Sequence, residues 1–223
     1  MKYHDLLNLI IAIFFSALIF SLFDISKYFF FLITAAFFFL VSYFTKFLVA
    51  RQLGFEIRTK LISFKRLGFQ YQSPFPIPAW LIFPLLFSLI SYNALKILTI
   101  LGTYYKPLPK RLRYKFELDE YDMAKISMVS IIACLFFTIL FYYLGFYEIA
   151  SFGAWFVVSN LIPLGSLDGS RIFYGSWLAW IFIFVFCAIE LVLIHLVSPL
   201  ISIIIGILFA FVIFIYFLYQ YLI

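Results

Sequence analysis

The most informative stretch of the chain is Asn160-Leu161-Ile162-Pro163-Leu164-Gly165-Ser166-Leu167-Asp168-Gly169, because it places a carboxamide and a carboxylate inside an otherwise apolar sequence. A charged group at membrane depth is costly and marks a functional site by default. Pro163 and Gly165 interrupt a helix and free backbone groups that must find partners, so a span is expected to unwind here around a cavity. The alternative is an ordinary helix end where Asp168 pairs with Arg171 and has no function.

The composition excludes a soluble domain. Of the 223 residues, 66% are hydrophobic and only 12% are charged, and the mean hydropathy is +1.13. These values are typical of a polytopic integral membrane protein. The net charge of +6 comes from Lys and Arg in connecting segments, so we expect it to set the topology and to attract anionic lipid headgroups, with no nucleic acid as partner.

Seven apolar windows approach the length that crosses about 30 Å of hydrocarbon. They cover residues 6–23, 28–49, 79–101, 125–144, 149–167, 176–197 and 200–222.

Two connections, 51–66 and 106–125, are strongly basic, and the positive-inside rule places both in the cytoplasm. Residues 79–101 lie between them and are therefore expected to re-enter the membrane without crossing it. The prediction is a single domain over 1–223 with six spans and both termini cytoplasmic, in the cell membrane. A seven-span chain with an external C-terminus is the alternative.

The segment 54–64, just after the second predicted span, alternates in the manner of a strand. A short β-hairpin here would offer an edge to which an extended peptide could add as a further strand. An ordinary basic loop is the alternative.

The decapeptide is similar to a known signature, the Asn-x-x-Pro-x-x-x-Leu-Asp-Gly motif of the site-2 protease family of intramembrane zinc metalloproteases. The resemblance implies an all-α polytopic core of six spans. In that family the Asp of the motif is the third zinc ligand and the Asn helps to hold the substrate. The resemblance therefore gives Asp168 the place of a vestigial metal ligand and puts Asn160 and Pro163 at the substrate cleft.

The other motifs of the family are degenerate in this chain. Residues 46–54 resemble the tail of the helix that carries His-Glu-x-x-His, and the register this sets puts Ser42, Tyr43 and Lys46 at the first His, the Glu and the second His. A third element, Gly-Pro-x-x-Asn, would fall near Ser130 and is degenerate as well.

No register of the first motif produces a histidine. A shift by one residue brings in Val41 or Thr45, and the two histidines of the chain, His4 and His195, lie far from the motif. Zinc hydrolysis needs three protein ligands, a water molecule and a carboxylate base. Ser42 and Tyr43 supply neither the ligand field nor the base, and a lysine is a cation where a cation should bind.

We therefore expect an inactive relative of the site-2 proteases that kept the membrane core, lost the metal and binds no cofactor. In this hypothesis the ammonium of Lys46 replaces zinc and pairs with Asp168. The apolar cleft would then bind transmembrane segments of other proteins.

Two alternatives from other classes remain. One is an active intramembrane zinc metalloprotease in which Asp168 is joined by Glu56, Asp119, Asp122 or a histidine. The other is a small transporter or channel, indicated by a broken helix with Asn and Asp at membrane depth.

Overall fold

The fold is given by a computed structural model that describes residues 3–61, 63–67, 71–92, 94–99, 101–108, 120–193 and 197–222. Its elements are α1 (Tyr3–Phe20), the 3-10 helix η1 (Ile25–Lys27), α2 (Tyr28–Gln52), β1 (Phe55–Leu61), β2 (Phe64–Leu67), β3 (Tyr71–Ile77), α3 (Ala79–Ile90), β4 (Leu101–Pro107), α5 (Glu120–Tyr143), α6 (Tyr147–Leu161), α7 (Asp168–Gly175), α8 (Trp177–Leu193) and α9 (Pro199–Leu222).

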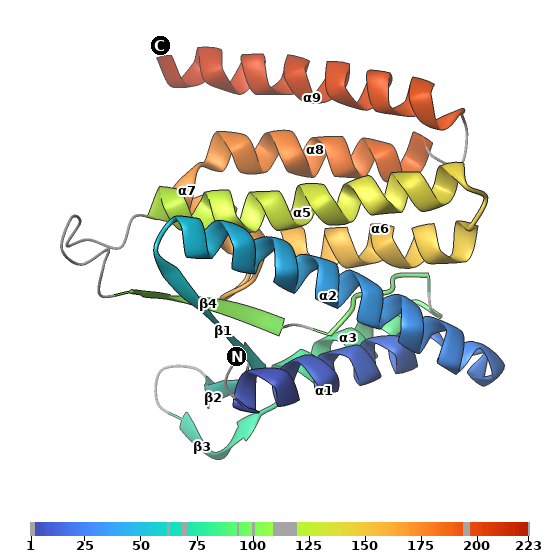
Figure 1. The fold of residues 1–223 in the computed structure, drawn as a ribbon, viewed down its shortest axis with the longest axis vertical. Coiled ribbons are helices and arrows are strands. Elements are labelled where there is room, and N and C mark those ends of the chain that lie inside the picture. The colour runs from blue at the N-terminus through green and yellow to red at the C-terminus, as the bar shows by residue number, and fades with distance from the viewer. Residues whose placement is uncertain are drawn as a thin grey trace.

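The helices form a stack with the strands on one flank. Helices α5, α6, α8 and α9 run alongside one another, and α2 crosses this group on the side where α1, α3 and the strands lie (Figure 1). The centre of the core is aromatic: the ring of Phe38 lies 5.9 Å from those of Phe152 and Phe156. A Cβ at Gly153 would lie 2.4 Å from Phe38 Cζ. Close approach of helices at small residues is typical of membrane cores.

Four helical segments of the described chain are long and apolar enough to cross a membrane: Tyr3–Phe20, Ile25–Gln52, Glu120–Tyr143 and Leu200–Leu218. This agrees with an integral membrane protein that is mostly helical. The windows 149–167 and 176–197 also hold helices, but α6 has 15 residues and α8 has 17. The window 149–167 is shortened because its helix ends at Leu161, where Ile162 leaves the helical conformation ahead of Pro163.

The window 79–101 does not form one helix. Helix α3 spans only 12 residues and ends at Ile90, and residues 96–99 belong to neither helix nor strand. The backbone N–H groups of Leu98 and Thr99 donate to the hydroxyls of Ser159 on α6 and Ser16 on α1, at 3.0 and 3.2 Å. Leu98 and Thr99 therefore lie between two helices, and buried hydroxyls accept hydrogen bonds from their backbone N–H groups.

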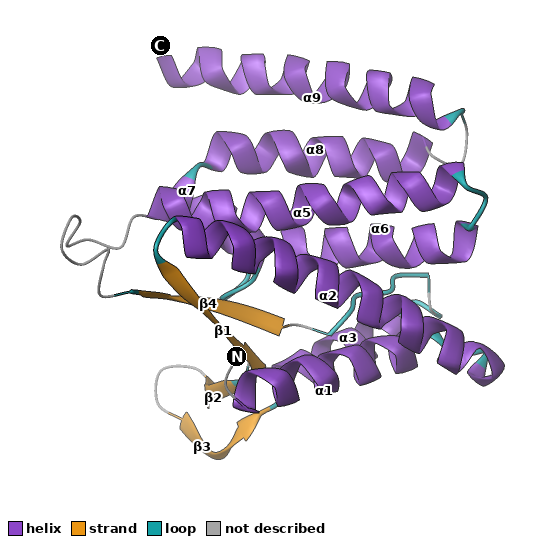
Figure 2. Ribbon diagram, in the orientation of Figure 1, coloured by secondary structure: helices purple, strands orange, loops and turns teal. Residues whose placement is uncertain are grey.

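The strand predicted after α2 is present, but its partner is not its neighbour in sequence. Strand β1 pairs antiparallel with β4, with Glu56 opposite Lys106 and Thr59 opposite Thr103 (Figure 2). The local hairpin is β2 with β3, further along the chain. Strand β1 lies within the first basic connection and β4 leads into the second, so their pairing brings the described parts of these connections together, as the 2.9 Å hydrogen bond from Leu108 N–H to the Gly54 carbonyl shows.

Candidate functional site

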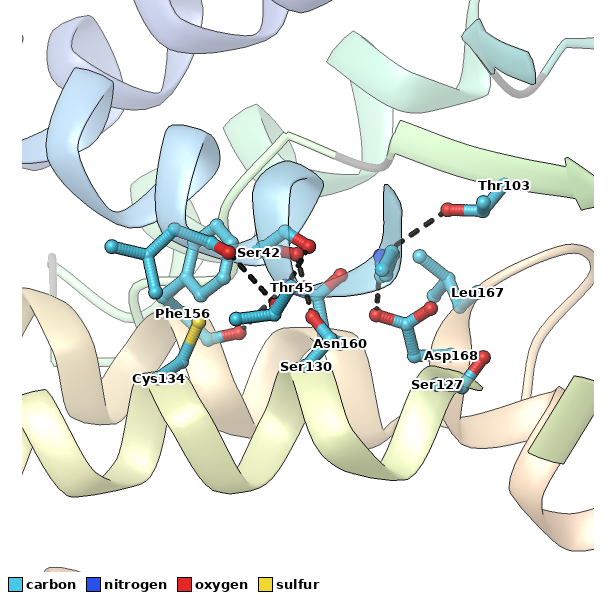
Figure 3. Close-up of polar contacts among 12 residues, drawn as sticks. Ser42, Thr45, Thr103, Ser127, Ser130, Cys134, Phe156, Asn160, Leu167 and Asp168 are labelled. Carbon is cyan, nitrogen blue, oxygen red and sulfur yellow. Dashed lines mark hydrogen bonds and ion pairs between the residues drawn. The ribbon is translucent and has the colours of Figure 1, made fainter. Parts of the chain in front are cut away.

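Lys46 and Asp168 form a buried ion pair. The Lys46 Nζ atom lies 2.7 Å from Asp168 Oδ2, and the two side chains are 8% and 2% exposed. Lys46 also donates to the Thr103 hydroxyl at 3.2 Å. Figure 3 shows Thr103 and Asp168 turned toward the same nitrogen from β4 and from the start of α7. Lys46 on α2 therefore contacts both β4 and α7, two segments that are far from it in the sequence.

The turn between α6 and α7 places Asp168. Gly165 has a φ of +58°, a left-handed conformation that glycine adopts without steric cost. A Cβ on Gly169 would lie 2.1 Å from the Leu161 carbonyl oxygen, so only glycine allows α7 to pack against the end of α6. That same carbonyl accepts a 2.9 Å hydrogen bond from Trp180 Nε1. In the Asp-Gly sequence, Asp168 thus supplies the charged group and Gly169 allows the backbone of α7 to lie close to that of α6.

Arg171 is not the partner of Asp168. Its Nη1 lies 3.9 Å from Met123 Sδ, and Asp168 turns instead to Lys46. The second carboxylate oxygen, Oδ1, is buried and has no hydrogen-bond partner among the described residues. Asp168 is the first residue of α7, where the helix dipole favours a negative charge. The alternative of an Asp168–Arg171 pair at a simple helix end is therefore wrong.

A second polar contact lies one helical turn before Lys46. The hydroxyls of Ser42 on α2 and Ser130 on α5 are 2.8 Å apart and buried. Ser42 and Lys46 are four residues apart and share one face of α2. The hydroxyl of Thr45, in contrast, donates back to the Val41 carbonyl at 2.8 Å. Ser42 and Lys46 therefore make contacts with other elements, whereas Thr45 bonds within α2.

A small cavity of about 20 Å³ adjoins the ion pair. Its lining combines polar and apolar side chains from five elements: Leu9, Phe39, Ser42, Tyr43, Lys46, Ile57, Thr59, Leu101, Thr103, Phe156 and Asn160. A space of this size holds about one water molecule. In the state described, the cavity therefore has no room for a substrate helix.

The two residues assigned to the cleft lie in different surroundings. Asn160 lines the cavity, and its Nδ2 donates to the Phe156 carbonyl of its own helix at 2.9 Å. Pro163 is exposed in the turn after α6 and does not line the cavity. Tyr43 lines the cavity and stacks on Phe47, with ring centroids 6.5 Å apart.

Thr103 and Tyr105, on β4, were not found by sequence reasoning. Thr103 contacts Lys46, and the Tyr105 hydroxyl lies 3.0 Å from that of Ser127. Burial raises the pKa of Tyr105, so its hydroxyl stays neutral. The run of Thr103, Tyr104 and Tyr105, residue types that favour strands, could have indicated a strand here, but the apolar window 79–101 ran into it and hid its start.

The described donors do not fit zinc. Asp168 is held by a lysine, Glu56 pairs with Arg58 at 3.2 Å and Asp122 with Lys125 at 3.4 Å. No group of three His, Cys, Asp or Glu side chains able to hold a metal occurs in the part of the chain that the structure describes. His4 is exposed on α1, while Asp119 and His195 lie outside the described residues.

Comparisons with known proteins add no identification: no family model, no curated protein and no solved structure matches the chain.

Proposed function

We propose that this protein is a non-proteolytic relative of the site-2 intramembrane metalloproteases that binds transmembrane segments or other parts of partner membrane proteins. The observation that carries the proposal is the contact of 2.7 Å between Lys46 and Asp168. In this interpretation the lysine ammonium occupies the position that a zinc ion has in the active enzymes. A buried cation that neutralises the carboxylate leaves no ligand for a metal and no base for water.

The residues at the degenerate motif positions support the proposal because they meet one another in space. Ser42 contacts Ser130, and Lys46 contacts Asp168, so positions from all three motifs adjoin. Substitutions that fit together in this way form a neutral, hydrogen-bonded centre. Such a centre supports a role in packing and binding over hydrolysis.

We further propose the six-span topology with both termini in the cytoplasm. The pairing of β1 with β4 supports it, because two paired strands lie on the same side of a membrane and each adjoins a basic connection. A seven-span chain would separate 51–66 from 106–125 by the thickness of the bilayer. Loop charge then places both connections in the cytoplasm.

Site-specific photo-crosslinking in native membranes tests the binding function. A photoreactive amino acid at Tyr43, which lines the cavity, is compared with one at Phe44, which is 59% exposed on the other face of α2. We expect position 43, and not position 44, to capture a peptide that mass spectrometry assigns to a membrane segment of another protein. Lipid adducts alone at both positions would contradict the proposal.

Elemental analysis tests the loss of the metal. The protein is purified in detergent without chelators, wild type beside Asp168→Ala, and no zinc is expected in either. Zinc at about one atom per chain in the wild type, absent from the variant, would make Asp168 a ligand and overturn the non-proteolytic interpretation.

A further inference from the structure

The first half of α1 closes both the outer edge of β1 and the cavity beside the ion pair. Asp5, Asn8 and Leu9 follow the helical spacing that puts side chains on one face. Asp5 and Asn8 contact β1, and Leu9 lines the cavity. One short stretch of helix therefore covers two features that a binding partner would need.

The contacts with β1 imitate a neighbouring strand. The Thr59 N–H donates to Asp5 Oδ1 at 3.0 Å, and the Thr59 carbonyl accepts from Asn8 Nδ2 at 2.8 Å. The Thr59 hydroxyl also donates to the Asp5 backbone carbonyl at 3.0 Å. In an antiparallel ladder, one residue of the added strand supplies the same pair, an acceptor for N–H and a donor for C=O.

Both backbone groups of Thr59 point away from β4, which pairs with the opposite edge of β1. Because this direction repeats every second residue, the backbone groups of Ile57 and Leu61 lie on the same outer edge. The edge thus offers three residues in succession to an extended chain. Ile57 and Thr59 also line the cavity, so a strand added here would lie against it.

We propose that the N-terminal half of α1 is a displaceable cover, and that an extended segment of a partner polypeptide takes its place by pairing with β1. This inference rests on the proposed function and names how its site is opened. Side-chain hydrogen bonds at one residue are replaced by a ladder over three, and this gain offsets part of the cost of moving α1 aside. The cavity gains access to the partner in the same step, because Leu9 leaves with the helix.

The test uses the full-length protein in lipid nanodiscs and a defined probe. The probe is a synthetic ten-residue peptide of alternating valine and threonine with one photoreactive residue. Its control is the same peptide N-methylated at every residue, which removes the N–H groups of both edges so that neither can pair with a strand. Labelled positions are mapped by mass spectrometry.

We expect the double variant Asp5→Ala/Asn8→Ala to be labelled on β1 about tenfold more than the wild type, because two hydrogen bonds that hold the cover are lost. The variant Leu7→Ala, at an exposed position of the same helix, should behave as the wild type. The N-methylated peptide should label none of them. Equal labelling of the double variant and the wild type, or labelling that survives N-methylation, would overturn the inference.

A second variant keeps the test decisive if the double variant does not fold. Asn8→Asp preserves the size of the side chain but turns an acceptor toward the Thr59 carbonyl, and should raise labelling in the same direction. If both wild type and variants label strongly and equally, the cover is refuted while the binding function stands. If Asn8→Asp and wild type are both unlabelled, β1 is not a peptide site and the inference falls, while crosslinking at Tyr43 still decides the proposed function.

Discussion

Asp168 and Glu190 both carry carboxyl groups buried in the helical core, but the partners of the two groups differ. Asp168 lies against the ammonium of Lys46, whereas Glu190 accepts a hydrogen bond at its Oε2 from the hydroxyl of Ser202, at 2.7 Å. Glu190 is 3% exposed, and its Oε1 has no partner among the described residues. The first site is therefore an ion pair, and the second is a hydrogen-bonded contact between α8 and α9.

The largest effect should come from breaking the ionic site. Lys46→Met or Asp168→Asn alone leaves an uncompensated buried charge, and each is expected to cost about 3–5 kcal/mol of stability. The double variant should recover much of that loss. Thermal or denaturant unfolding in detergent measures the cycle, and strictly additive losses would show that the two groups do not act as a pair.

Gly169→Ala tests whether the ionic site depends on the close packing of α7 against the end of α6, which positions Asp168. The added Cβ meets the Leu161 carbonyl, which cannot swing aside as a flexible side chain would. We expect a loss of at least about 2 kcal/mol, from overpacking and a shift of α7. Gly145→Ala is a suitable control for glycine replacement in a turn, since its Cβ would meet nothing within 4 Å, although its φ of +84° adds a strain of its own. A variant at Gly169 as stable as the wild type would mean that the α6–α7 packing is not tight.

Ser42→Ala is expected to have an intermediate effect. It leaves the buried hydroxyl of Ser130 without its partner, at a cost of about 1 kcal/mol. Removing both hydroxyls with Ser42→Ala/Ser130→Ala should cost little more than the single change. Unfolding measurements on the three variants check this, and a double loss of twice the single one would contradict a direct contact.

The smallest effect should come from Glu190→Gln, at under about 1 kcal/mol. The amide keeps an oxygen for the Ser202 hydroxyl and removes no charge if the carboxyl is neutral. The same acid-to-amide change at Asp168 should cost several times more, and measuring both variants under one condition tests the contrast. Equal losses would mean that Glu190 is ionised and paired, and the difference between the two sites would vanish.

The sequence was informative where residue chemistry constrains local geometry. Pro163 and Gly165 predicted the end of α6, whereas the contact of Lys46 with Asp168 was predicted only through the resemblance to the site-2 protease motifs, which puts both residues at one site. A buried carboxylate needs a cation, and few cations lie in apolar stretches of this chain.

Pairing over long distances was beyond the sequence. The strand pattern after α2 was visible, but nothing in it selects β4 over a local hairpin, because both offer the same backbone groups. The cover formed by Asp5 and Asn8 was hidden for a related reason. Near the start of α1 these residues have the composition of an ordinary helix end, and only the fold brings them to Thr59.

The ion pair also constrains how the protein is made. Lys46 is synthesised about 120 residues before Asp168, and a ribosome adds roughly 5–20 residues per second. Lys46, near the end of α2, therefore has no carboxylate partner for a period on the order of ten seconds, because Asp168 has not yet been synthesised. Because an unpaired ammonium is costly to bury, we expect α2 to reach its final depth only after α7 has emerged. Biogenesis of this protein is therefore expected to pass through a late step in which a charge is drawn into the membrane by its partner.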